Sequence, residues 1–303
     1  MTGTKLQYLD RQNIDILKWD RCIETAMNSM PYAFSYYLDN MAPDWQAIVA
    51  GDYKTVMPLT WRKKFGITYL YQPAFTQQLG VFSDAVVDYG MLETMLAETK
   101  KHFGFAEIFL NYRCDFPGTS SQHNFILNLG RSYPDIRAGY KTDLVNNLRQ
   151  SGKTALRYTE CELVSALENF RTAYATRFPH VTNNDYKAFK SLCEFARENQ
   201  KLVLRAVYDE AGAILSSALF ISDCRRLILL QSFTSSEGRH RHANHYLLDR
   251  VIHEFAGSQL TLDFEGSEVP GIAHFYRNFG AADQPYFFYR YNELPWPIRL
   301  FKK

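Results

Sequence analysis

The stretch RLILLQSFTSSEGRHRHANHYLLDRVIHEFAGSQLTLDFEGS (Arg226–Ser267) decides the fold class of this chain. It begins with RLILLQSF (Arg226–Phe233), whose aliphatic composition is typical of a buried central strand. A polar loop, Thr234–Asn244, leads into HYLLDRVIHEFAG (His245–Gly257), which has helical spacing and ends at a glycine. The strand-like LTLDFEG (Leu260–Gly266) follows. Strands and a helix in this order predict an α+β unit.

The same order of elements occurs in both halves of the chain. Before this stretch, LRAVYDEAGAILSSAL (Leu204–Leu219) adds two strands joined by a turn. In the first half, the corresponding strands are WQAIVAGDYKTVMPL (Trp45–Leu59), ITYLYQPAFTQQLGVF (Ile67–Phe82) and, after a helical stretch, AEIFLNY (Ala106–Tyr112). Such an internal echo predicts a duplicated unit with one cleft between its copies.

Length and composition agree with two domains. The chain has 303 residues, of which 46% are hydrophobic and 15% aromatic, so each half can bury a core. We predict an N-terminal domain at residues 1–145 and a C-terminal domain at residues 146–303, with PWPIRLF (Pro295–Phe301) crossing back onto the first domain. Asp185–Glu198 is a predicted helix with Asn183 and Asn184 as candidate N-caps.

Charge and cysteine usage limit the partners and the compartment. A net charge of +2 is too mild to indicate nucleic-acid binding by itself, and no DNA partner is expected. Apolar runs are far shorter than the roughly 20 residues that a membrane span needs. The five cysteines are odd in number and never spaced as CxxC. This pattern predicts reduced thiols in a cytoplasmic protein, with neither disulfides nor a metal site.

Four segments carry a resemblance to a known family: ANHYLLDRVI (Ala243–Ile252), DFEGS (Asp263–Ser267), FYRNFGA (Phe275–Ala281) and QPAFTQQLGVFS (Gln72–Ser83). In their order the chain resembles the FemAB-type branch of the GNAT acyltransferase fold, in which two GNAT-like domains are joined in tandem. The resemblance implies a mixed α+β fold with a mixed central sheet flanked by helices in each domain. It places the basic helical segment YKTDLVNNLRQSGK (Tyr140–Lys153) between the domains.

The resemblance also implies a donor site in the second domain. In the GNAT fold two adjacent parallel strands splay apart, and the acyl donor lies in the gap. Here these strands would be Arg226–Phe233, whose Ser232 and Phe233 would line the gap, and Leu260–Phe264. The phosphates of the donor would face the N-terminus of the following helix.

The loop before that helix departs from the family's glycine-rich pattern. Aligned with that pattern, Arg239 takes the leading basic position, and His242 and Asn244 stand where glycines are usual. Their side chains would crowd a pyrophosphate, because glycine lets the backbone approach closely. The donor therefore stays open between acyl-CoA, as a possible co-substrate, and aminoacyl-tRNA.

Candidate catalytic residues follow the second strand. Tyr276 matches the family tyrosine that acts as general acid toward the leaving sulfur, and its alternative role is packing into the core. Asp263 and Glu265 are expected to point to one side by the two-residue strand period, where a carboxylate could deprotonate or hold an amine. The alternative for these carboxylates is capping a turn or pairing with an arginine.

The resemblance places the acceptor cleft in the first copy, where the candidate acceptor-binding residues are Tyr71, Gln72, Gln77, Gln78 and Arg113. Glutamine amides bind amides and sugars without charge, although a polar loop between strands would have the same composition. The resemblance implies an N-acyltransferase that moves an acyl or aminoacyl group from a thioester or ester donor to an amine, with no tightly bound cofactor. The alternative is a catalytically silent small-molecule binding protein that kept the fold.

Overall fold

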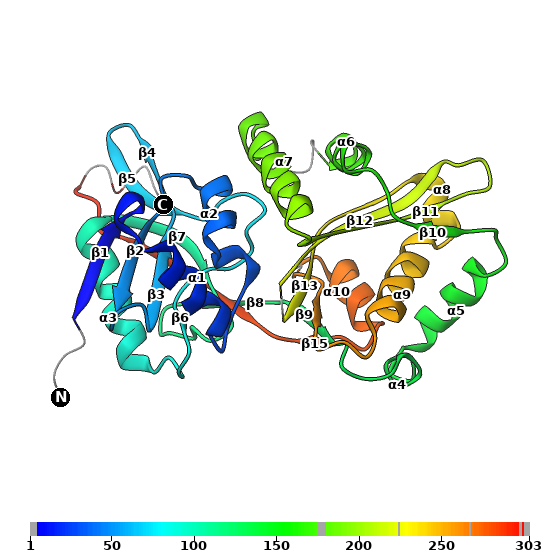
Figure 1. The fold of residues 1–303 in the computed structure, drawn as a ribbon, viewed down its shortest axis with the longest axis horizontal. Helices are drawn as coiled ribbons and strands as arrows, with labels where there is room; N and C mark the ends of the chain where they lie inside the picture. The colour runs from blue at the N-terminus through cyan, green and yellow to red at the C-terminus, as the bar shows by residue number, and fades with distance from the viewer. Residues whose placement is uncertain (1–4, 175–179, 224, 267, 297–298, 300–303) are drawn as a thin grey trace. The chain divides into compact units, whose positions relative to one another are not determined.

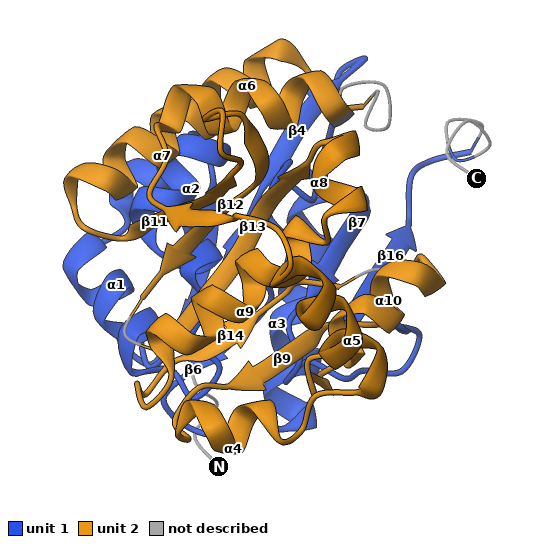
Figure 2. Ribbon diagram, turned by 90° about the vertical axis from the view of Figure 1, so that its right-hand side faces the viewer, with its two compact units in different colours: residues 1–122, 285–303 blue, residues 123–284 orange. Residues whose placement is uncertain are grey.

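A computed structural model describes residues 5–174, 180–223, 225–266, 268–296 and 299. The chain forms two compact units (Figure 2). Unit 1 contains residues 1–122 and 285–303, and unit 2 contains residues 123–284. The mixed α+β fold class predicted from the sequence is confirmed, because helices and strands alternate along both units (Figure 1).

Unit 2 is built on one seven-stranded sheet with the order β10-β11-β12-β13-β14-β9-β15. Its strands are β9 (Phe125–Asn128), β10 (Arg157–Thr159), β11 (Leu202–Tyr208), β12 (Ile214–Ser222), β13 (Arg226–Thr234), β14 (Thr261–Asp263) and β15 (Ala282–Asp283). Neighbours in this sheet are antiparallel except for β13 and β14, which are parallel. The sheet therefore contains one parallel pair near its centre.

Helices cover both faces of this sheet (Figure 1). They are α4 (Tyr133–Arg137), α5 (Thr142–Ser151), α6 (Leu163–Tyr174), α7 (Asn183–Glu198), α8 (Ser236–His240), α9 (Ala243–Phe255) and α10 (Pro270–Arg277). On one face, Leu247 and Leu248 of α9 share a buried core with Ala218 and Phe220 of β12. On the other face, α6 packs against β12 and β13. The N-cap of α7 is Thr182, which forms a capping box with Asp185, so neither predicted asparagine caps this helix.

Unit 1 has two sheets, with the orders β1-β2-β3-β6 and β4-β5-β7-β16-β8. The strands are β1 (Leu6–Asp10), β2 (Gln46–Ala50), β3 (Thr55–Leu59), β4 (Trp61–Lys64), β5 (Ile67–Tyr71), β6 (Phe82–Ser83), β7 (Phe105–Leu110), β8 (Ser120–Gln122) and β16 (Tyr286–Asn292). The helices are α1 (Ile16–Thr25), α2 (Ser35–Met41) and α3 (Tyr89–His102), with 3-10 turns at Arg11–Asn13 and Pro31–Ala33. The parallel pair β5 and β7 repeats the β13 and β14 pair of unit 2.

The division into units differs from the predicted boundary between residues 145 and 146. Strand β9 pairs with β14, so the chain enters unit 2 already at His123. The basic segment 140–153 lies within unit 2, where Leu144 of α5 is part of the core, and does not connect the units. The chain returns at Pro285, and β16 pairs with both β7 and β8 of unit 1. Most of the predicted return segment, 295–301, lies outside the described residues.

Candidate functional site

The parallel pair in unit 2 separates after three residue pairs. These pairs are Arg226–Thr261, Leu227–Leu262 and Ile228–Asp263. Beyond Ile228, β13 continues to Thr234 and pairs only with β12, while β14 ends at Asp263. In the described part of unit 2 no strand takes the vacated side of β13. We name this side of β13, from Leu229 to Thr234, the slot: its backbone N–H and C=O groups have no strand partner in the described part of unit 2 and require another partner.

A β-bulge lies where the strands separate. Leu219 of β12 pairs with Gln231, and Phe220 pairs with Leu229, so Leu230 is an extra residue in β13. A bulge bends its strand and increases the local twist. The bulge therefore turns the end of β13 away from β14 and helps to open the slot.

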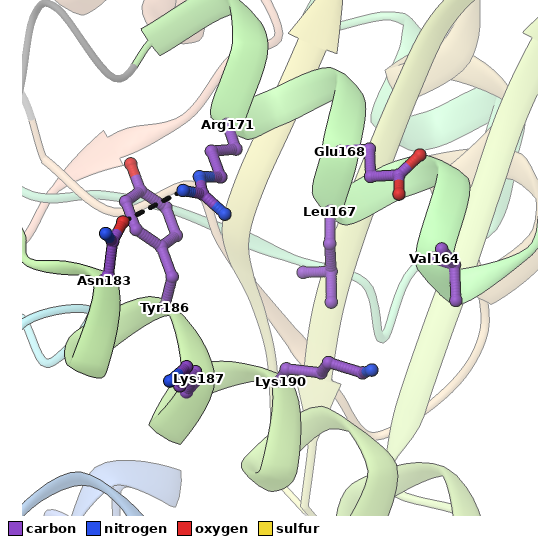
Figure 3. A pocket seen from close by; sticks show the side chains of 8 residues that line it. All are labelled: Val164, Leu167, Glu168, Arg171, Asn183, Tyr186, Lys187 and Lys190. Atoms are coloured by element: carbon purple, nitrogen blue, oxygen red, sulfur yellow. Dashed lines mark hydrogen bonds between the residues drawn. The ribbon is translucent and has the colours of Figure 1, made fainter.

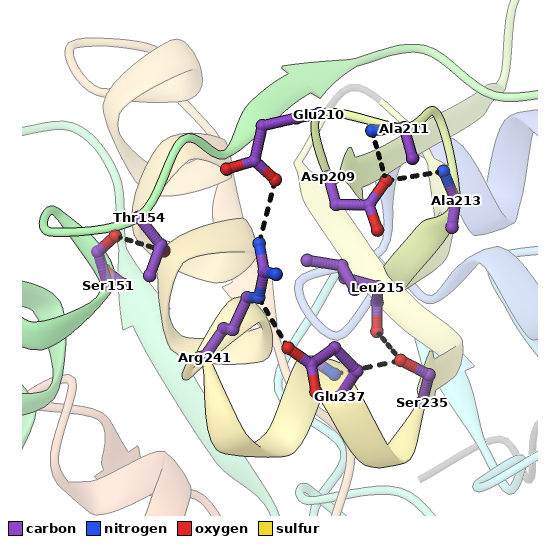
Figure 4. A network of polar contacts seen from close by, with 11 residues as sticks. Ser151, Thr154, Asp209, Glu210, Ala211, Ala213, Leu215, Ser235, Glu237 and Arg241 are labelled. Atoms are coloured by element: carbon purple, nitrogen blue, oxygen red, sulfur yellow. Dashed lines mark hydrogen bonds and ion pairs between the residues drawn. The ribbon is translucent and has the colours of Figure 1, made fainter.

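Short polar contacts hold the loop that follows β13 (Figure 4). The Ser235 Oγ accepts a hydrogen bond from Gly238 N at 2.9 Å and caps α8. The Arg241 guanidinium binds Glu237 at 2.7 Å and Glu210 at 3.0 Å, which ties α8 to the turn between β11 and β12. A Cβ at Gly238 would lie 2.1 Å from Leu215 O. Glycine is therefore required here for close packing of the helix on β12.

At one of the two positions where the family pattern has glycine and this chain does not, the loop keeps a backbone conformation that favours glycine. His242 has a φ of +54°, in the left-handed region, and precedes α9 without a side-chain cap for that helix. Arg239 is exposed, and its Nη1 donates a hydrogen bond to Thr234 O at 2.9 Å. The Asn244 Oδ1 is buried, and no described residue donates a hydrogen bond to it. His242 and Asn244 thus lie at the start of α9, whereas Arg239 lies in the preceding helix α8 and contacts the end of β13.

His245 in the first turn of α9 is a neutral imidazole. Burial, with a smaller contribution from His242, lowers the pKa of His245 to about 4. The Asn147 Nδ2 donates to its Nε2 at 3.1 Å, and the ring lies edge-on to Phe275 with 4.9 Å between centroids. Near neutral pH His245 therefore adds no positive charge to this loop.

Asp263 is part of a buried ion pair at the base of the slot. It binds Arg226 at 2.6 Å, and the side chains are 1% and 7% exposed. It also accepts hydrogen bonds from Asn124 Nδ2 at 3.3 Å and from Glu265 N at 2.9 Å. Both carboxylate oxygens are thus engaged, which favours a structural role over that of a base. Glu265 has a φ of +58°, so the expected two-residue strand period does not extend to it.

Tyr276 packs in an aromatic cluster. Its ring stacks on Phe264 with 4.9 Å between centroids and contacts Phe125 at 6.2 Å. Phe264 belongs to the core on the α9 side of the sheet, and strand alternation places Asp263 on the opposite side. The structure therefore does not bring Tyr276 and Asp263 together on one face. A catalytic role for either residue stays a prediction.

In unit 1 the corresponding slot is filled by the chain itself. The β5 and β7 strands pair only at Leu70–Ala106 and Tyr71–Glu107. The Gln72 Oε1 then accepts a hydrogen bond from Phe109 N at 3.0 Å. Farther on, Leu79 N donates to Phe109 O at 2.8 Å, and Asn111 N donates to Leu79 O at 2.7 Å. The segment after β5 thus occupies the opening that stays unfilled by strands in unit 2.

The remaining residues predicted to bind the acceptor are also held by neighbours within unit 1. Tyr71 lies under the guanidinium of Arg62, with 4.1 Å to the ring centroid. Gln78 is fully buried, and its Nε2 donates to Gln77 Oε1 at 2.8 Å. Arg113 is exposed at the edge of a cavity of about 20 Å³, which is large enough for a single water molecule. Acceptor binding by these residues stays a prediction.

A groove of about 390 Å³ separates α6 from α7 (Figure 3). Its lining residues are Val164, Leu167, Glu168, Arg171, Asn183, Tyr186, Lys187 and Lys190. Arg171 closes one end, where its Nη2 donates to Asn183 at 2.9 Å and its guanidinium lies over Tyr186. All lining residues come from the two helices, so the groove is not the slot.

Sequence reasoning missed two residues at the slot, Arg226 and Gln231. The sequence could have indicated both, because they are polar residues within an otherwise aliphatic strand. A charged side chain in a buried strand needs a partner, and Asp263 in the next parallel strand supplies it. Gln231 is 5% exposed, and no described residue accepts a hydrogen bond from its Nε2.

No protein-family model and no curated protein sequence matches the chain. Among solved structures, it is similar to FemX, with a TM-score of 0.65 and 14% identity over 97% of this chain and 99% of FemX. It is similar to a GCN5-related N-acetyltransferase from Sphaerobacter thermophilus, with a TM-score of 0.51 and 10% identity over 96% of each chain. It is also similar to the C-terminal domain of a putative lysylphosphatidylglycerol synthetase from Agrobacterium fabrum. The TM-score is 0.50 and the identity 7%, over 95% of this chain and 94% of that domain.

These similarities confirm the predicted tandem GNAT-like fold and the resemblance to the FemAB-type group. They extend over nearly the whole chain and over nearly the whole of each of these structures. At identities of 14% or less they show the fold alone. None of the described helices is long and apolar enough to cross a bilayer.

Proposed function

We propose that the chain is an N-acyltransferase that moves an acyl or aminoacyl group from a thioester or ester donor to an amine. The observation that carries this proposal is the slot between β13 and β14. Strand β13 runs on for six residues beyond its last pair with β14, from Leu229 to Thr234. An extended donor can bind there as an added strand, with hydrogen bonds to the backbone of β13.

The reaction needs little beyond positioning. The amine nitrogen attacks the carbonyl carbon, a C–N bond forms, and the C–S or C–O bond of the donor breaks. The departing thiol or hydroxyl takes the proton that the amine loses. No covalent enzyme intermediate is required, so orientation of the donor and polarisation of its carbonyl can supply most of the rate.

The start of α9 is the proposed site for the phosphates of the donor. Its first N–H groups have no side-chain cap, and the helix dipole favours an anion there. Arg239, in the short helix α8 that precedes α9, adds an exposed arginine to this loop. Acyl-CoA and aminoacyl-tRNA both carry phosphates as well as a reactive carbonyl group, so both are candidate donors. Neither is proposed as a resident cofactor, and the cytoplasmic location stays a prediction.

Isothermal titration calorimetry of the full chain tests this proposal. Acetyl-CoA, octanoyl-CoA and a charged tRNA mixture are titrated in turn, and micromolar binding of at least one is expected. Arg239→Ala should weaken that binding about tenfold, the effect of losing one charge-assisted hydrogen bond. Arg197→Ala is the matched control, because Arg197 is an exposed arginine in the last turn of α7. Equal losses in both variants would contradict a specific role for Arg239.

The second candidate is a catalytically silent small-molecule binding protein. The side chains of His242 and Asn244 favour it, since they occupy a loop that glycines usually leave open for a pyrophosphate. A wild-type protein that gives no heat with either acyl-CoA or with charged tRNA would support this candidate. Binding of a donor followed by transfer to an added amine, measured by mass spectrometry, would exclude it.

A further inference from the structure

The amide of Gln231 is a buried hydrogen-bond donor that no described residue satisfies. Gln231 is 5% exposed, and its Nε2 has no acceptor among the residues that the structure describes. Most buried polar groups in native proteins have a partner, so an unsatisfied one calls for an explanation. Leaving such a donor buried costs stability. The natural partner is an acceptor atom that the described residues do not provide.

The position of Gln231 along β13 places it at the slot. It follows the bulge at Leu230 and lies three residues beyond Ile228, the last residue that pairs with β14. Among the described strands, β12 is therefore the one neighbour that β13 has at Gln231. The adjacent open side is where the proposed donor would bind.

The pairing with β12 also fixes the face of the sheet. Opposite residues of an antiparallel pair lie on the same face, and Gln231 pairs with Leu219. The neighbours of Leu219, Ala218 and Phe220, belong to the α9 core, so Leu219 and Gln231 lie on the α6 side. Arg226 and Asp263 lie on this side as well, at the base of the slot. No carboxylate or imidazole of β13 competes for the Gln231 amide, because the strand has none.

We propose that the Gln231 Nε2 donates a hydrogen bond to the carbonyl oxygen of the donor bound between β13 and β14. This assignment rests on the proposed acyltransferase function and adds to it a side chain that recognises the reacting group. The same hydrogen bond would strengthen as the carbonyl oxygen gains negative charge during attack by the amine. An amide suits this role because it donates without competing for the proton of the amine.

The test compares acetyl-CoA with S-ethyl-CoA, a thioether that lacks the carbonyl oxygen. Gln231→Met keeps the length of the side chain and removes the donor. Calorimetry should show acetyl-CoA binding weakened about five- to tenfold in this variant, with S-ethyl-CoA binding unchanged. Leu219→Met is the matched control, because Leu219 is the buried cross-strand neighbour of Gln231 and its change removes no polar atom.

A second measurement uses the protein without ligand. If the Gln231 amide finds its acceptor only in a bound ligand, Gln231→Met should raise the Tm of the ligand-free protein by about 2–4 °C. Residues kept for binding often lower stability in this way. A fall in Tm of several degrees that the Leu219→Met control does not show would mean that Gln231 has a structural partner, and would overturn the proposal.

The binding results distinguish a wrong assignment of Gln231 from a wrong assignment of the acyltransferase function. Unchanged acetyl-CoA affinity in Gln231→Met, or equal losses for acetyl-CoA and S-ethyl-CoA, would overturn the assignment of Gln231 alone. A wild-type protein that binds neither acetyl-CoA, octanoyl-CoA nor charged tRNA would overturn the proposed function, and this assignment with it.

Discussion

Replacing Asp263 by asparagine should destabilise unit 2 strongly, because it leaves the Arg226 charge buried without its counter-ion. The two side chains are 1% and 7% exposed and lie 2.6 Å apart. Removal of one partner of such a buried pair typically costs about 3–5 kcal/mol of the free energy of unfolding. Asparagine has nearly the volume of aspartate, so a packing defect contributes little. The contacts to Asn124 and Gln284 add to the loss if they rearrange.

Urea unfolding followed by far-UV circular dichroism measures this loss. All four tryptophans lie in unit 1, so their fluorescence reports that unit separately. Asp143→Asn is the matched control, because this aspartate of α5 is 70% exposed and should change stability by less than about 0.5 kcal/mol. The double variant Arg226→Met with Asp263→Asn should recover at least half of the loss, since no buried charge is then left alone.

The opposite pattern would refute this reasoning. If Asp263→Asn unfolds within about 1 kcal/mol of the wild type, the ion pair does not stabilise unit 2. If such a stable variant also loses transfer activity, Asp263 is the base predicted from the sequence. A double variant less stable than Asp263→Asn would show that Arg226 stabilises the fold through other contacts.

Three further predictions concern the loop, its histidine and the filled slot of unit 1. Gly238→Ala should cost about 1–3 kcal/mol in urea unfolding because its Cβ would lie 2.1 Å from a backbone oxygen, whereas Gly271→Ala in open space should cost nothing. His245 has a folded-state pKa of about 4, below its unfolded value of about 6.5, so the unfolded state binds the proton first. Stability should therefore fall by about 2 kcal/mol from pH 7 to pH 5 in the wild type, and this fall should be absent in His245→Phe. Gln72→Ala should cost about 1–3 kcal/mol by leaving Phe109 N unsatisfied, and calorimetry should show unchanged donor binding. Transfer to the amine should also be unchanged, because a loss of transfer would indicate that Gln72 binds the acceptor.

The elements of the second half could be predicted because their signals are local. The aliphatic run at 226–233, the helical spacing at 245–255 and the positive φ of Gly257 each depend on neighbouring residues. Their order was enough to indicate the GNAT-like fold. The bulge at Leu230 could not be predicted, because it exists only through the pairing of β13 with β12.

The boundaries of the units depend on contacts between segments that are distant in the sequence. The same contacts decide whether the slot of each unit is filled by the chain. Strand β16 joins β7 across more than 170 residues of chain, and no local pattern marks that pairing. The sequence suggested that Gln72 binds the acceptor. Its side chain is instead bonded to Phe109 N, a contact that appears only when β5 and β7 lie side by side. The ion pair of Asp263 with Arg226 likewise depends on the pairing of two strands that are distant in the sequence.

The insertion of β16 between β7 and β8 has a consequence for biosynthesis. Unit 2 is one continuous segment, residues 123–284, and can complete its sheet as soon as it has left the ribosome. Unit 1 must wait for Tyr286–Asn292, the last of its described strands along the chain, while its nascent β7 keeps an exposed edge. A stop codon or a premature release before this strand would therefore damage the N-terminal part of the protein, although every residue of that part had been made.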